Sequence, residues 1–235
     1  MGKILFAFDL YGTLLSTSSI AKVLTEHYGA GKAESMQGVW RKYQLEYSWR
    51  LNCMKQYEDF ETVTYKSLLH TLTEHDVEIR QQVVDSVMKA YDNLSTFPDV
   101  AAALRSLKDT PGVECVVFSN GSQKMINNSV NSSKDLKPVS SAFSQLVSVD
   151  HMRSFKPDPE VYRYLAQCVD MAGQESQLWL VSSNPFDVVG ARAVGMNAVW
   201  VDRTGKGWQD KLGLEPTKII RGLGGLTELV SSLKG

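Results

Sequence analysis

The chain has 235 residues, 43% hydrophobic and 22% charged, a composition typical of a globular protein rather than of a disordered or fibrous chain. Its 25 basic and 26 acidic residues are scattered and leave a formal net charge of -1, so we expect no nucleic-acid partner. Three widely separated cysteines exclude a disulfide framework and a cysteine-based zinc site.

The sequence shows no sign of membrane targeting. No apolar stretch approaches the roughly 20 residues of a membrane-spanning helix. The first ten residues, MGKILFAFDL, reach an aspartate too early for a signal peptide, and no small-residue cleavage site follows. We therefore expect a cytoplasmic protein that does not associate with membranes.

The first part of the chain predicts one strand followed by helices. Residues 3–9, KILFAFD, form a continuous apolar run typical of a strand in the centre of a parallel sheet. From Ser16 to Leu94, apolar residues recur at intervals of three and four, which predicts an all-helical block of roughly four helices. These predicted helices cover residues 20–29, 36–51, 57–75 and 77–94.

Beyond Phe97-Pro98, predicted strands and helices alternate. The strands cover residues 113–119, 146–150, 178–183 and 197–203, and the helices cover 159–173, 186–195 and 226–234. This alternation is typical of βαβ units with right-handed crossovers. We therefore expect an α/β fold: a doubly wound parallel sheet built from residues 1–15 and 94–235, with a helical-bundle cap, residues 16–93, inserted after the first strand.

Polar residues end the predicted strands. They are Asp9, Ser119-Asn120, Asp150 and Ser182-Ser183-Asn184. Ligands of doubly wound sheets bind beyond the carboxyl ends of the strands, so we expect these residues to share a site. The helical insertion begins just past Asp9 and is expected to cover that site.

Four segments carry a family resemblance. They are FDLYGTL (8–14), SNG (119–121), FKPDPEVY with Lys156, and VSSNPFDVVGARAVGM (181–196). In order and spacing they resemble the four motifs of the haloacid dehalogenase superfamily, and the resemblance extends from residue 3 to residue 203. It implies a Rossmann-like catalytic core in which Asp9 is a covalent nucleophile.

Two positions indicate the branch of the superfamily. Phosphatase members carry a second aspartate two residues after the nucleophile, where this chain has Tyr11, and a phenol is a poor base at neutral pH. Their Mg²⁺ ligands align with Ser183 and Asp187, so one ligand has become a neutral hydroxyl. Both losses disfavour phosphoryl transfer. The chain is instead similar to the metal-independent (S)-2-haloacid dehalogenases, and no cofactor or metal is expected.

The segment WRKYQLEYSW (40–49) also resembles this branch, which implies that Arg41 receives the leaving halide together with Asn120. The alternative for Arg41 is a solvated helix face, on which it forms an ion pair with Glu46 or a neighbour. The aromatic neighbours of Arg41 favour a buried cation that awaits an anion.

The remaining roles are implied by the same resemblance. The substrate carboxylate is held by the Ser119 hydroxyl and the backbone N–H groups of Leu10 and Tyr11. Asp9 attacks C2 opposite the halogen, and the ester is hydrolysed by water held by Asp187, with Asn184 and Lys156 nearby. The pocket walls are Tyr11, Leu45, Phe60 and Phe186, and Thr13, Ser182 and Tyr162 match further active-site positions.

Several alternatives stay open at this point. Lys156 could be a surface lysine, Thr13 and Ser182 could only cap turns, and Tyr162 could only pack in the core. Lys42 and Pro185-Phe186 depart from the residues common in the branch and are expected to line the pocket. The resemblance also implies dimerisation through the cap.

The predicted function is hydrolytic dehalogenation of short 2-haloalkanoic acids to 2-hydroxy acids through an aspartyl ester. The alternatives are a Mg²⁺-dependent phosphatase of the same superfamily and a catalytically idle member that keeps the fold.

Overall fold

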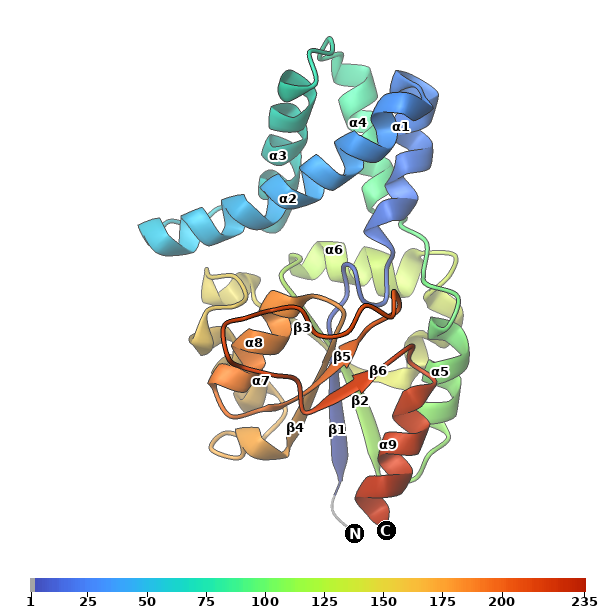
Figure 1. Cartoon of the computed structure of the whole chain (residues 1–235), viewed down its shortest axis with the longest axis vertical. Helices are drawn as coiled ribbons and strands as arrows, with labels where there is room; N and C mark the ends of the chain where they lie inside the picture. Colours follow the sequence, from blue (N-terminus) through green and yellow to red (C-terminus); the bar gives the residue numbers. More distant parts are fainter. Residues whose placement is uncertain (1–2) are drawn as a thin grey trace.

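A six-stranded parallel sheet lies at the centre of the computed structural model, which describes residues 3–235 (Figure 1). The strands are β1 (Ile4–Phe8), β2 (Val113–Ser119), β3 (Phe143–Ser148), β4 (Leu178–Ser182), β5 (Asn197–Val201) and β6 (Lys218–Ile220). Their order in the sheet is β3-β2-β1-β4-β5-β6, and every neighbouring pair is parallel. The predicted doubly wound sheet is confirmed. Its order reverses between β1 and β4, where ligands of such sheets bind.

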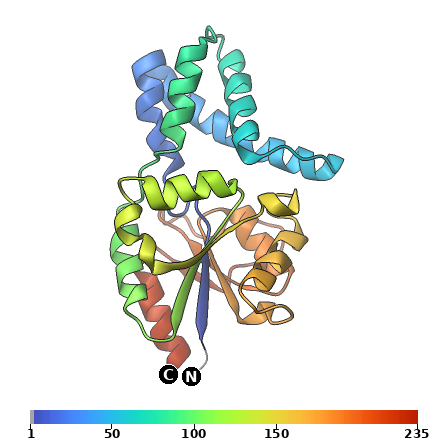
Figure 2. The ribbon, with the colours of Figure 1, turned by 180° about the vertical axis from the view of Figure 1, so that it is seen from behind.

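Helices cover both faces of the sheet (Figures 1 and 2). On one face α5 (Val100–Lys108) packs against α9 (Gly225–Lys234), and on the other α7 (Pro159–Cys168) packs against α8 (Pro185–Ala193). The strands are therefore enclosed by protein on both sides, and all five residues of β1 and of β4 are buried. This explains why both strands read as continuous apolar runs in the sequence.

The residues after β1 form a helical block above the carboxyl ends of the strands (Figure 1). It contains a 3₁₀ turn at Thr17–Ile20 and the helices α1 (Ala21–Tyr28), α2 (Ala30–Met54), α3 (Phe60–Glu74) and α4 (Gln81–Tyr91). Asp59 starts α3 by accepting a hydrogen bond from the Thr62 N–H. Helix α2, with 25 residues, extends from the block across the top of the core.

Several short elements were absent from the sequence prediction. They are α5, α6 (Gln123–Asn127), β6, a π-helical turn at Asn128–Ser132, and 3₁₀ turns at Lys137–Ala142, Asp150–Met152 and Glu175–Gln177. Most contain too few residues for a periodic pattern to be recognised. The division into a core (1–15 and 94–235) and a cap (16–93) stays a prediction, and its residues 1–2 lie outside the described residues.

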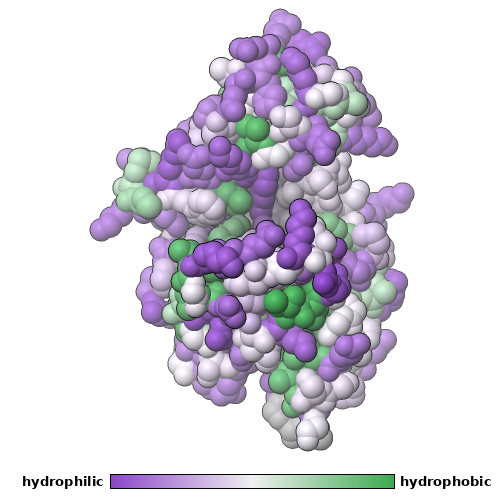
Figure 3. Space-filling view, viewed as in Figure 1, coloured by the Kyte–Doolittle hydropathy of each residue, from purple (hydrophilic) through white to green (hydrophobic). Residues whose placement is uncertain are grey.

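Figure 3 shows mainly hydrophilic side chains over the helical block, with hydrophobic ones in small separate patches. Along residues 3–235, no helix combines the length and the apolar character needed to cross a membrane.

Candidate active site

Asp9 lies one residue beyond β1, and its two carboxylate oxygens have different surroundings. Oδ2 accepts hydrogen bonds from Thr13 Oγ1 at 2.7 Å, Asn184 Nδ2 at 2.7 Å and Ser182 Oγ at 3.4 Å. Within residues 3–235, Oδ1 accepts only from Lys156 Nζ, at 3.2 Å. The Oδ2 lone pairs are engaged, so Oδ1 is the oxygen available for attack.

The turn after Asp9 needs a glycine. Gly12 has a φ of +91°, and a Cβ there would lie 3.2 Å from Asn184 Oδ1. The missing side chain lets the turn reverse and lets Asn184 reach Asp9. The Thr13 hydroxyl also accepts from the Ser183 N–H at 2.9 Å, and the Ser182 hydroxyl accepts from the Asn184 N–H at 3.1 Å. Both hydroxyls thus fix a turn and also contact Asp9.

Lys156 is only 1% exposed, so the surface alternative for it is wrong. Its Nζ donates to Asp9, to Asp187 Oδ2 at 2.9 Å and to the Phe118 carbonyl at 2.8 Å. An ammonium has three N–H donors, so all three are used. The buried cation therefore compensates two buried carboxylates at once.

Asp187 is fully buried and receives the Tyr162 hydroxyl on Oδ1 at 2.8 Å. Burial raises the pKa of Asp187 to about 6, with Lys156 opposing the rise and the charge of Asp9 adding to it. A carboxylate of this pKa is a stronger base than an ordinary aspartate. Tyr162 is buried in the core, which agrees with the alternative of a packing role, but its hydroxyl also contacts Asp187.

Arg41, on α2, lines the same cavity as Asp9. Its Nη2 donates to the Tyr11 carbonyl at 3.2 Å and to Asn184 Oδ1 at 3.3 Å, and its Nη1 donates to Gln44 Oε1 at 2.7 Å. The alternative ion pair with Glu46 is wrong, because Glu46 pairs with Arg50.

Lys42 does not line the pocket, contrary to our expectation. Its side chain is exposed, and its Nζ lies 5.6 Å from the centre of the Tyr43 ring. Residues 41 and 42 project about 100° apart on a helix, so Arg41 and Lys42 cannot both face the core. Phe186 does line the pocket and packs edge-on against Trp49, with ring centres 5.6 Å apart.

These side chains enclose a cavity of only about 10 Å³ beside Asp9. It is lined by Asp9, Tyr11, Arg41, Leu45, Phe60, Ser119, Asn120, Lys156 and Phe186. The space holds about one water molecule, so the structure shows a closed site. Burial raises the pKa of the Tyr11 phenol above its ordinary value, so this side chain stays protonated and is no base.

Free donors surround the same cavity. Within residues 3–235, the N–H groups of Leu10 and Tyr11 donate to no backbone oxygen. The Ser119 hydroxyl accepts from the Gly121 N–H at 3.1 Å, which leaves its own proton free. Successive free N–H groups beside a hydroxyl form a concave anion-binding arrangement.

The structure thus brings the residues with predicted catalytic and substrate-binding roles together around Asp9, but not Lys42 or Asp150, and the role of each residue stays a prediction. Sequence reasoning did not single out Gln44, which contacts Arg41 directly. The available signal was its position three residues after a predicted functional arginine on one helix, where side chains are neighbours.

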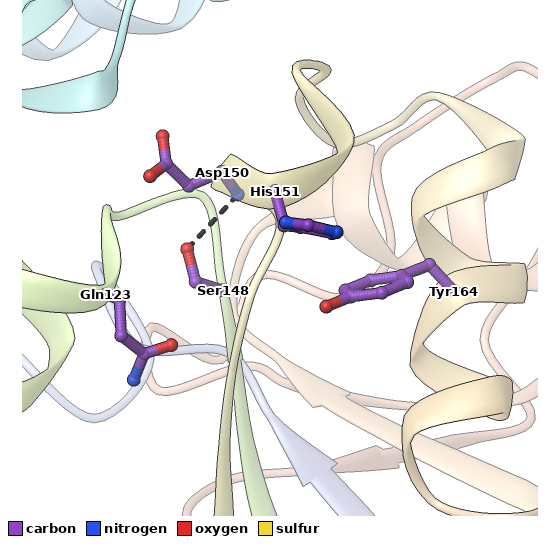
Figure 4. A pocket seen from close by; sticks show the side chains of 5 residues that line it. All are labelled: Gln123, Ser148, Asp150, His151 and Tyr164. Carbon is purple, nitrogen blue, oxygen red and sulfur yellow. Dashed lines mark hydrogen bonds between the residues drawn. The ribbon is translucent and has the colours of Figure 1, made fainter.

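Asp150 is the exception among the polar strand-end residues, because it faces a different and larger cavity of about 390 Å³. Gln123, Ser148, Asp150, His151 and Tyr164 line that cavity, and Figure 4 shows the Ser148 hydroxyl accepting the Asp150 N–H, at 3.1 Å. The two cavities share no lining residue. β3 lies two strands from β1, which ends next to Asp9, so the end of β3 is displaced from the site.

Comparisons with known proteins agree with this geometry. The family model of haloacid dehalogenase-like hydrolases matches residues 5–195. The chain belongs to this family. Its relatives among haloacid dehalogenase-like hydrolases include (S)-2-haloacid dehalogenase H-109 of Pseudomonas putida, 36% identical over 94% of this chain and 95% of the relative. Haloacetate dehalogenase H-2 of a Moraxella species is 34% identical over 96% of each chain.

Solved structures give the same result. L-2-haloacid dehalogenase from Xanthobacter autotrophicus, with chloropropionic acid covalently bound, superimposes with a TM-score of 0.86 at 29% identity. The match covers 99% of this chain and 100% of that one. A dehalogenase with an intermediate complex matches with a TM-score of 0.87 at 30% identity, over 97% and 96% of the two chains.

The residues do not fit the magnesium site of the phosphatase members. Ser183 stands where a second acidic ligand would be, and its hydroxyl accepts from Arg203 Nη1 at 3.1 Å. Arg203 is in turn held by both oxygens of Asp99. A fixed guanidinium beside a neutral hydroxyl disfavours a divalent cation. Within residues 3–235, no three His, Cys, Asp or Glu side chains are grouped to hold a metal ion.

Proposed function

We propose that this chain hydrolyses short (S)-2-haloalkanoic acids to 2-hydroxy acids through an ester on Asp9, without a metal ion. The observation that carries the proposal is the arrangement around Asp9: three donors engage one of its carboxylate oxygens, and Asp9 and the half-buried Arg41 line the same closed cavity. The names of the relatives, several of them (S)-2-haloacid dehalogenases, support the substrate class.

The first step forms the ester. The substrate carboxylate binds to the Ser119 hydroxyl and to the N–H groups of Leu10 and Tyr11. Asp9 Oδ1 attacks C2, and the electron pair of the carbon–halogen bond leaves with the halide toward Arg41 and Asn120. Enclosure by Leu45, Phe60 and Phe186 removes water from the carboxylate, which is otherwise a weak nucleophile.

The second step consumes water. Asp187 accepts a proton from water as the water oxygen attacks Cγ of Asp9, and the bond from Cγ to the ester oxygen breaks. The departing alkoxide takes the proton back from Asp187 to give the 2-hydroxy acid, and the re-formed Asp9 carboxyl loses its proton to solvent. Lys156 stabilises negative charge next to both carboxylates. In total, one haloacid and one water give one hydroxy acid, one halide and one proton. Because C2 is inverted once, an (S)-2-chloro acid yields an (R)-2-hydroxy acid.

A Mg²⁺-dependent phosphatase is not favoured by the comparisons or by the residues. Tyr11 replaces the second aspartate and stays protonated, and Ser183 is bound to Arg203. A catalytically idle protein is disfavoured by the complete set of polar contacts around Asp9.

The deciding experiment follows chloride release from (S)-2-chloropropionate with and without EDTA. We expect (R)-lactate and equal rates in both conditions. A second arm uses Asp187→Asn, which should trap the ester as a covalent mass increase on Asp9 in mass spectrometry. Phosphate release from a generic ester that requires Mg²⁺, or no halide from any short haloacid, contradicts the proposal.

We further propose a cytoplasmic homodimer that forms through the helical block. Trp49 and Met54 of α2 are exposed by 37% and 56%, which supports a contact surface there. Light scattering of the purified chain after size exclusion tests the assembly, and cell fractionation tests the location. A monomer at high concentration contradicts the first proposal.

A further inference from the structure

We propose that Gln44 is a positioning residue: it aims the Arg41 guanidinium at the halide side of the cavity and leaves its charge free for the departing anion. The inference rests on the proposed dehalogenase function and adds a determinant of leaving-group preference to it.

Gln44 lies one helical turn after Arg41 on α2 and is 1% exposed. Its Oε1 accepts from Arg41 Nη1 at 2.7 Å. Its Nε2 donates to Thr64 Oγ1 at 2.7 Å and to the Tyr91 hydroxyl at 2.9 Å. The amide is therefore held from α3 and α4 while it holds the arginine, so three of the four block helices fix the guanidinium.

The partners of Gln44 are themselves fixed. The Thr64 hydroxyl donates to the Phe60 carbonyl at 2.6 Å, within α3. The Tyr91 ring stacks on Tyr11 with centres 5.5 Å apart and packs against Trp40 at 5.3 Å. A side chain held by such a buried network loses little further freedom when its arginine meets a ligand.

The charge of Arg41 is not neutralised by these contacts. All its hydrogen-bond acceptors are neutral: the Gln44 amide, the Tyr11 carbonyl and the Asn184 amide. Arg50, Arg163 and Arg203 by contrast each form an ion pair with a carboxylate. In the described part of the chain Arg41 forms no ion pair, so its charge is available for an anion.

This arrangement predicts a dependence on the leaving group. Chloride leaves less readily than bromide and carries more concentrated charge, so it gains more from a correctly aimed, unpaired guanidinium. Gln44→Glu keeps the shape and the hydrogen bond to Arg41 but pairs the guanidinium with a carboxylate. Gln44→Met keeps the approximate volume but removes the acceptor.

The experiment measures kcat/KM of the wild type and both variants for (S)-2-chloropropionate and (S)-2-bromopropionate. For Gln44→Glu we expect a fall of about 100-fold with the chloro acid and about tenfold with the bromo acid, so the bromo/chloro ratio rises about tenfold. Gln44→Met should shift the ratio in the same direction by a smaller factor. Inhibition by added bromide should also weaken.

Gln82→Glu is the matched control, because Gln82 lies exposed on α4 of the same block and the same charge is introduced there. It should leave the ratio unchanged. If Gln44 had a merely structural role, its substitution would lower kcat/KM for both substrates by the same factor, and that result overturns the proposal. If Gln44→Glu does not fold, Tyr91→Phe, which removes one partner of the amide, must still raise the ratio.

The outcomes separate the two proposals. If the wild type releases no halide from either acid, the proposed function fails and this inference fails with it. If the wild type is active and no variant changes the bromo/chloro ratio, the function stands and only the role of Gln44 is wrong.

Discussion

The side-chain amide of Asn52, on α2, pairs with both polar groups of the Phe155 backbone. Its Nδ2 donates to the Phe155 carbonyl at 2.6 Å, and its Oδ1 accepts from the Phe155 N–H at 3.0 Å. Phe155 precedes Lys156, so these two hydrogen bonds join the C-terminal end of α2 to the core next to the buried cation of the site. A cavity of about 10 Å³ admits no haloacid, so the site must open for substrate to enter, and we expect this contact to stabilise the closed arrangement.

Asn52→Ala removes the two hydrogen bonds to Phe155, each contributing about 1 kcal/mol, and a longer one from the Ser154 hydroxyl at 3.3 Å. We expect kcat/KM for the haloacid to fall about 5- to 30-fold, because the closed state is less populated. Steady-state kinetics with a thermal melt check the result. Asn93→Ala is the control, since the Asn93 amide is exposed and donates only to the Lys89 carbonyl. Equal effects of both changes would show that Asn52 does not hold the block closed.

Hydrolysis of the ester should slow on the acid side. Asp187 must be ionised to accept a proton from water, and its base form is lost as the pH falls through its raised pKa of about 6. The negative charge of Asp9 contributes to the raised pKa of Asp187, and ester formation removes that charge. We therefore expect the acid limb of the profile of hydrolysis rate against pH at or below about pH 6. Rapid quenching and mass spectrometry of the ester give the single-turnover rates.

Tyr162→Phe should move this limb to higher pH. The Tyr162 hydroxyl donates to Asp187 and lowers its pKa, so loss of this hydrogen bond raises the pKa of Asp187 further. Tyr164→Phe, two residues along on α7 and in the other cavity, is the control and should leave the limb in place. A limb that moves to lower pH in Tyr162→Phe would contradict the assignment of Asp187 as the base.

Gly190→Ala should disturb the contact between Tyr162 and Asp187 by crowding the tyrosine. A Cβ at Gly190 would lie 2.4 Å from the Tyr162 hydroxyl, so the tyrosine must move away from Asp187. Overpacking of this kind costs about 1 to 3 kcal/mol in the free energy of unfolding, and ester hydrolysis should slow as well. Denaturant titration measures the loss. Gly38→Ala on α2, where a Cβ meets nothing within 4 Å, should be neutral or stabilising.

Lys156→Met should be strongly destabilising at neutral pH. It leaves the carboxylates of Asp9 and Asp187 buried without their cation, a loss of about 3 to 5 kcal/mol. The loss should shrink toward pH 5, because protonation of a carboxylate removes the uncompensated charge. Lys66→Met breaks an exposed pair with Glu58 and should cost at most about 1 kcal/mol at any pH. Unfolding curves at pH 7.5 and pH 5 compare the two variants.

The amino-acid sequence by itself determined the order of most of the long elements and the position of Asp9 at the end of the first strand. Apolar periodicity is a local property, so it predicted the strand before Asp9, the four helices of the block and the alternating strands and helices that follow. Parallel strands bring their carboxyl ends to one edge of the sheet. For that reason the sequence alone predicts that Asp9, Ser119 and Ser182 lie together.

Only the tertiary structure decided which side chains meet across elements. The burial of Lys156 between two carboxylates depends on β1, α8 and the loop before α7 packing together. The choice of Gln44 rather than Glu46 as the partner of Arg41, and the outward direction of Lys42, depend on how α2 is rotated over the core. Such contacts join residues far apart in the chain and are set by packing, which no local pattern encodes.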